Sequence, residues 1–210
     1  MLEIGIDKLV KSYIYGDTVE MTTANGQQEQ KIKVIKGKRY VNLETGEIHD
    51  MDTSNCNRLD NLKSTKQTMR KLRRLIAHNF TGGENQLWIT LTYREHVINP
   101  EVVYKDFKAF IRRIRHSFGH VEYIAVIEPQ ESGRWHLHVL MKNDSTLRVP
   151  NVILADLWGK GFTKTKRLRR ADKVGNYLIA YLSNLQLEDT KSELKAIVKG
   201  ARLYMYPKGI

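Results

Sequence analysis

Residues 121–141 read VEYIAVIEPQESGRWHLHVLM and decide the fold that we predict for this chain of 210 residues. Two apolar runs, 121–128 and 135–141, contain the β-branched and aromatic side chains that are typical of strands. The polar segment between them includes Gly133, which can take a positive φ in a hairpin connection. We therefore predict an antiparallel pair of strands within the central sheet.

Outside this hairpin, the spacing of apolar residues indicates both helices and strands. Asn99 can cap a helix that has Pro100 at its first position, and Gly119 ends that helix. The predicted elements are a strand at 87–93, a helix at 100–118, a short helix at 150–158, a strand or extended arm from Phe162 and a helix at 171–185. This order favours an α+β sandwich with an antiparallel sheet.

The first part of the chain has a different character. Residues 1–58 contain short strand-like runs such as 32–35 and 39–43, which predict a small, mostly β appendage. Residues 60–78 combine apolar residues at helical spacing with many lysines and arginines, so they predict a basic helix. That helix either presents a solvated surface or lies along DNA. We expect a second domain at 59–210 that includes it.

The overall charge favours a polyanionic partner. The chain has 35 Lys and Arg against 23 Asp and Glu, a formal net charge of +12, and such an excess is common in proteins that bind nucleic acid. Cys56 is the single cysteine, which excludes an intrachain disulfide and a cysteine-based zinc site. Neither a signal peptide nor a membrane span is evident in the sequence, so we expect a cytoplasmic protein without a membrane partner.

His136 and His138 form a candidate pair of metal ligands. Because side chains alternate along a strand, both imidazoles point the same way while Leu137 turns into the core. Glu128, on the preceding strand, can lie opposite one of them and share its face. Two imidazoles and one carboxylate leave positions open for a phosphate oxygen. The alternative is a chance pair of exposed histidines.

Tyr177 and Tyr181 are candidate nucleophiles. They are four residues apart in the last predicted helix and therefore lie on one face of it. A tyrosine hydroxyl can attack phosphorus when a metal withdraws charge and its deprotonation is assisted. Tyrosines at this spacing also serve for packing, so the residues alone leave both interpretations open.

Taken in order, three short segments resemble the motifs of the HUH endonuclease superfamily. The segments are 88–93 (WITLTY), Glu128 with 136–138 (HLH), and 174–177 (VGNY). Because the tyrosine follows the histidine pair, the order is similar to that of rolling-circle replication initiators (Rep proteins) of plasmids, phages and small DNA viruses. The resemblance covers roughly residues 86–185, about half of the chain.

The resemblance implies an RRM-like sandwich whose central antiparallel sheet carries the histidine pair on a middle strand. It implies that Glu128, His136 and His138 hold one divalent ion, Mg²⁺ or Mn²⁺. It also implies a nick in single-stranded origin DNA, in which Tyr177 attacks phosphorus and leaves a 5′-phosphotyrosyl enzyme and a free 3′-OH. Tyr181 is then either a second nucleophile for the rejoining step or a packing residue.

The chain departs from the family pattern at one position. Family members usually carry a lysine three residues after the tyrosine, whereas this chain has Ala180, and Lys173 is a candidate replacement. Basic residues between the motifs, with Trp158 and Phe162 available for stacking, suit a bound single strand. The candidate DNA-binding residues are Arg94, Lys160, Lys164, Lys166, Arg167, Arg169, Arg170 and Lys173. A solvated basic loop with aromatic residues in the core is the alternative.

Two other classes of function remain open on the sequence. One is a single-strand DNA-binding module or repressor without catalysis, and the other is an HUH transposase. No GxxxxGK[ST] phosphate loop occurs within these 210 residues. We therefore expect unwinding to come from a host helicase or from another part of a longer protein.

Overall fold

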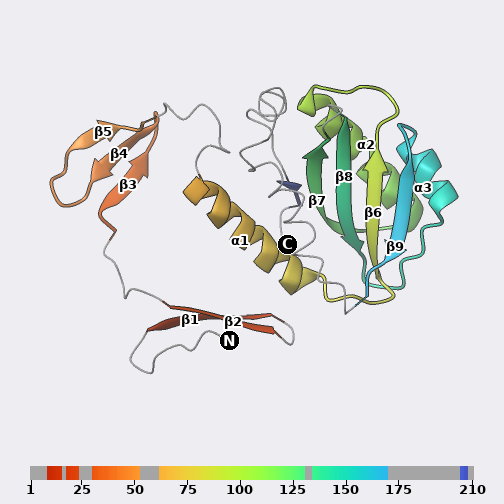
Figure 1. Cartoon of the computed structure of the whole chain (residues 1–210), viewed down its shortest axis with the longest axis horizontal. Helices are drawn as coiled ribbons and strands as arrows, with labels where there is room; N and C mark the ends of the chain where they lie inside the picture. Colours follow the sequence, from red (N-terminus) through yellow and green to blue (C-terminus); the bar gives the residue numbers. More distant parts are fainter. Residues whose placement is uncertain are drawn as a thin grey trace. The chain divides into compact units, whose positions relative to one another are not determined.

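The computed structural model contains two compact units, Met1–Cys56 and Asn57–Ile210 (Figure 1). The structure describes residues 9–15, 18–23, 30–52, 62–130, 134–169 and 204–207. No helix in this described part is long and apolar enough to cross a membrane.

The first unit consists of short strands in its described residues. They are β1 (Val10–Tyr15), β2 (Thr18–Thr23), β3 (Ile32–Ile35), β4 (Arg39–Asn42) and β5 (Ile48–Asp50). β1 and β2 form an antiparallel hairpin, and β3, β4 and β5 form a separate antiparallel meander. Gly37 and Lys38 both have positive φ, 84° and 56°, as a tight turn between β3 and β4 requires. A mostly β N-terminal part was predicted and is observed.

The second unit is built on a five-stranded antiparallel sheet. Its strands are β6 (Gln86–Thr92), β7 (Glu122–Pro129), β8 (Trp135–Lys142), β9 (Thr163–Arg167) and β10 (Tyr204–Met205). They lie in the order β10-β7-β8-β6-β9, so the predicted hairpin strand with the histidines is the middle one. β10 was not predicted. Two residues are too few to show an alternating pattern.

Two helices cover one face of this sheet: α2 (Pro100–Phe118) and α3 (Asn151–Trp158) (Figure 1). The side chain of Asn99 accepts a hydrogen bond from the Glu101 backbone N–H (2.9 Å), which is the predicted helix cap. Odd-numbered positions of the strands pack against these helices, and Phe107 and Leu137 are completely buried there. This layer is the larger part of the core.

The opposite face is partly covered by α1 (Leu62–Asn79), the predicted basic helix (Figure 1). Its buried residues Leu72 and Ile76 pack with even-numbered positions of the sheet, among them Val126 and Leu140. The unit is therefore a helix–sheet–helix sandwich, and the predicted RRM-like α+β class is confirmed. The predicted helix at 171–185 lies outside the described residues.

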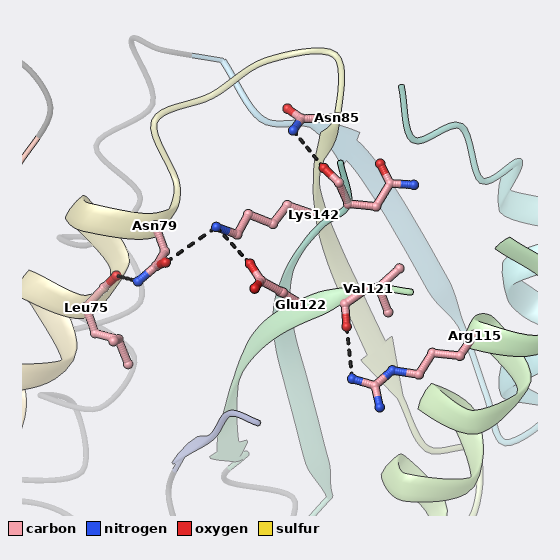
Figure 2. A network of polar contacts seen from close by, with 8 residues as sticks. Leu75, Asn79, Asn85, Arg115, Val121, Glu122 and Lys142 are labelled. Carbon is pink, nitrogen blue, oxygen red and sulfur yellow. Dashed lines mark hydrogen bonds and ion pairs between the residues drawn. The ribbon is translucent and has the colours of Figure 1, made fainter. Parts of the chain in front are cut away.

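A polar network holds the C-terminal end of α1 on the sheet (Figure 2). Lys142 Nζ lies 2.9 Å from Glu122 Oε2 and donates to Asn79 Oδ1 (3.4 Å), while the Asn79 side chain donates to Leu75 O in its own helix (2.9 Å). Lys142 also lies over the ring of Phe80, 5.7 Å from its centroid. Because Lys142 is the last residue of β8, this anchor is at the far end of the strand from His136.

Candidate metal centre and the adjacent sheet face

The pairing of β7 with β8 brings the three predicted ligands to one face. Glu128 is directly opposite His136, and Val126 is opposite His138, so the even-numbered positions of both strands share a side. On the other flank of β8 lies β6, with Thr92 opposite His136 and Thr90 opposite His138. The two threonines were not singled out from the sequence, because only the strand order makes them neighbours of the histidines.

The ligand atoms of Glu128, His136 and His138 all lie within 4.8 Å of one another. Glu128 Oε2 and His138 Nε2 are 3.0 Å apart, and both side chains are buried. His136 is half-buried, and its ring centroid is 6.5 Å from that of His138. The most accessible of the three ligands is therefore the one nearest the end of the strand.

The environment of His136 favours its neutral form. Burial lowers the pKa of His136, the nearby His138 lowers it further, and the Glu128 carboxylate opposes both effects. Neutral imidazole is the form that binds a metal. At neutral pH the ring is thus already in its ligating state.

The donor set fits a divalent cation. Two imidazole nitrogens and one carboxylate oxygen are suitable ligands for a first-row divalent metal, and three protein ligands leave coordination positions open. The 4.8 Å limit on their separation allows a shared ion. These residues can therefore hold a metal that also contacts a phosphate.

The segment before β9 packs very closely against the end of β6. Trp158 Nε1 donates to Thr92 O (2.7 Å), and Arg94 N donates to Lys160 O (2.8 Å). A Cβ on Gly161 would lie 2.4 Å from Thr92 O and 2.8 Å from Arg94 N. A glycine is thus required for β9 to pair with the strand beside the candidate metal ligands.

Replacing Gly161 with alanine is expected to lower the free energy of unfolding by about 1–3 kcal/mol, because the added carbon collides with backbone rather than with a movable side chain. Urea unfolding followed by circular dichroism measures the change. Lys160→Ala is the matched neighbour: its ion pair with Asp106 (3.4 Å) has a lysine that is 46% exposed, so its loss should cost less than about 1 kcal/mol. Equal stability of Gly161→Ala and the unmodified chain would contradict the packing argument.

The structure separates the predicted DNA-binding residues into groups. Lys164 and Lys166 are exposed and lie on the same sheet face as the histidines, and Arg94 and Arg169 are also exposed. Arg167 instead donates to two backbone carbonyls, those of Glu84 and Leu147, the latter at 2.9 Å. Lys160 is paired with Asp106. Arg170, Lys173, Tyr177 and Tyr181 lie outside the described residues.

Two aromatic residues near the candidate centre have structural roles. Trp158, predicted to be available for stacking, is 1% exposed, so for this residue the alternative of a core aromatic is correct. Tyr93 is also buried and donates to Asp106 Oδ2 (3.2 Å). Burial, followed by the charge and the hydrogen bond of Asp106, raises the pKa of Tyr93 well above its usual range. Tyr93 is thus unsuited to be a nucleophile.

The fold and this centre define a class: an α+β sheet domain with a two-histidine, one-carboxylate group on an open part of the sheet. Comparison with known proteins gives the family. Residues 86–186 match the model of a family described as replication-associated proteins of the ORF2 type, and this part of the chain is accordingly a Rep-type replication-associated domain.

One relative supports the same assignment. The chain is similar to the "Phasyl DNA replicon protein arp" of Escherichia coli, with 28% identity over 152 residues, covering 60% of this chain and 51% of the relative. The chain thus spans about half the length of this curated relative. No solved structure matches the chain significantly.

Proposed function

We propose that this chain initiates rolling-circle replication by nicking single-stranded origin DNA and later rejoining the strands. The observation that carries the proposal is the convergence of Glu128, His136 and His138 within 4.8 Å on one sheet face. The match of residues 86–186 to a family of replication-associated proteins supports the same role. The excess of positive charge, +12, suits a polyanionic substrate such as DNA.

Glu128, His136 and His138 would hold a divalent ion, Mg²⁺ or Mn²⁺, at the end of the sheet. Such an ion would polarise the scissile phosphate and stabilise charge on the leaving oxygen. The protein contribution is rigidity: His138 and Glu128 are buried between neighbouring strands, so their donor atoms are fixed before DNA binds. Open coordination positions remain for the phosphate.

The proposed nucleophile is the hydroxyl of Tyr177. Its oxygen forms a bond to phosphorus as the bond from phosphorus to the 3′ oxygen breaks, and the phenolic proton is lost while the 3′ oxygen gains one. The products are a 5′-phosphotyrosyl enzyme and a 3′-OH from which a polymerase can extend. Because one phosphodiester replaces another, rejoining needs no ATP. Tyr181 is proposed as a second nucleophile or a packing residue.

The remaining parts of the proposal concern the setting. The protein would act in the cytoplasm on a plasmid, phage or related replicon, with a host helicase or another part of a longer protein separating the strands. Residues 1–58 are proposed as a separate domain from 59–210.

A covalent-adduct assay tests the proposed activity. Purified protein is incubated with Mn²⁺ and a library of fluorescent single-stranded oligonucleotides that covers the origin region of the replicon encoding the chain. A labelled protein band that survives denaturing electrophoresis, and that disappears with EDTA, is expected. Tight binding without any adduct would favour the alternative of a binding module or repressor.

A further inference from the structure

The strand β9 continues the face of the candidate metal centre to the sheet margin. In the pairing of β6 with β9, Thr90 is opposite Lys164 and Trp88 is opposite Lys166. The backbone N–H of Thr92 donates to Phe162 O (3.0 Å), so the same register extends to Phe162. Phe162, Thr92, His136 and Glu128 thus form one row across four strands, and Lys164, Thr90 and His138 form the next.

The two sides of β9 have opposite characters. Phe162 is 65% exposed, and Lys164 and Lys166 are exposed on the same side. On the other side, Thr163 is buried and Arg167 is held by backbone carbonyls. An aromatic side chain this exposed has an energetic cost in water. Its place beside two lysines suggests a partner that offers both flat apolar surfaces and negative charges.

Single-stranded DNA has both features. Bases stack on aromatic side chains, while lysines contact the phosphates. Neighbouring strands of a sheet are about 4.8 Å apart, so Phe162 on β9 lies about 10 Å across the sheet from His136 on β8. Lys164 and Lys166 are about 7 Å apart along β9, given roughly 3.3 Å of rise per residue. This spacing is comparable to that of successive phosphates in an extended strand.

We infer that β9 is the track of the single strand: Phe162 stacks on a base close to the scissile phosphate, and Lys164 and Lys166 bind the phosphates that follow. The inference rests on the proposed function and assigns the substrate's path within it. Lys166 lies over the ring of Trp88, 5.8 Å from its centroid, which directs the ammonium along this sheet face. Arg167, on the other side of β9, is not part of the track.

Binding measured in EDTA tests the track without cleavage. The probe is a fluorescein-labelled oligothymidylate, and its anisotropy gives the dissociation constant. Phe162→Ala is expected to weaken binding about tenfold, a typical effect for the loss of one base–aromatic stack. Phe162→Trp retains a stacking surface and should stay within about twofold of the unmodified chain. A duplex probe, whose bases are already stacked, should not discriminate Phe162→Ala from the unmodified chain.

Salt dependence tests the two lysines. The double variant Lys164→Gln/Lys166→Gln should reduce the log–log salt slope by about 1.4, since each single-strand phosphate contact contributes about 0.7. The matched control is Lys105→Gln/Lys108→Gln, which removes the same charge from the exposed side of α2, beyond the opposite face of the sheet. The control should leave the slope unchanged.

The outcomes separate the track from the proposed function. Unchanged affinity in Phe162→Ala and an unchanged slope in the lysine double variant, with folding verified by circular dichroism, would overturn the track even if the protein nicks DNA. The expected losses in a protein that forms no covalent adduct would support the track and contradict the nicking activity. Equal loss of slope in the α2 control would show a diffuse charge effect and also overturn it.

Discussion

Phenylalanine in place of Tyr177 is expected to abolish the covalent protein–DNA adduct, the largest effect that we predict for any single substitution. The change removes only one hydroxyl, so packing is almost intact and lost activity reports on chemistry. The assay is a single turnover with excess protein, Mn²⁺ and a labelled origin oligonucleotide, followed by denaturing electrophoresis. Anisotropy in EDTA should show that the variant still binds the DNA.

Tyr181→Phe is the matched control because Tyr181 is one helical turn away in the predicted helix, about 6 Å along its axis. Only one hydroxyl at a time can be in line with the leaving oxygen, so Tyr181→Phe should still form the first adduct. Mass spectrometry should locate the DNA on Tyr177. An adduct on Tyr181 in the unmodified chain would reassign the nucleophile and leave the class of enzyme standing.

The second large effect is expected at the candidate metal centre. His136→Ala should reduce cleavage at least about 100-fold, which corresponds to about 2.7 kcal/mol of lost transition-state stabilisation. His136 is the best choice because it is half-buried, whereas His138 and Glu128 are buried and their removal would also disturb folding. DNA binding in EDTA should change little, since most of it comes from dispersed phosphate contacts.

Mn²⁺ binding, measured by isothermal titration calorimetry without DNA, gives a readout that does not depend on activity. The unmodified chain should bind one ion per chain, and His136→Ala should bind it at least about tenfold more weakly. His116→Ala is the matched control, because His116 is exposed on α2 and lies outside the Glu128, His136, His138 group. Equal Mn²⁺ affinity in all three proteins would exclude the proposed ligand set.

The hairpin at 121–141 could be predicted because a sheet imposes a period of two on its side chains. That period gives His136 and His138 a common face, and the short connection brings Glu128 across from His136. The cap at Asn99 and the strand at 86–92 follow from equally local rules. Local patterns of this kind are visible without knowledge of the strand order.

The rest depends on which strands become neighbours. Lys164, Lys166 and Arg167 are equivalent basic residues in the sequence, and only the pairing of β9 with β6 places Arg167 on the opposite side. Likewise, the periodicity of α1 predicts an apolar stripe without identifying the sheet residues that Leu72 covers. The nucleophile assignments remain predictions, because Tyr177 and Tyr181 lie outside the described residues.

The close packing at Gly161 has a consequence for insertions and deletions. One residue added between Gly161 and Thr163 would reverse the sides of β9, turning Lys164 toward the core and Thr163 outward. Two added residues would restore the alternation and lengthen only the connection. Natural variation in chain length at this turn should therefore occur in steps of two, a pattern that homologous sequences would record without any biochemical assay.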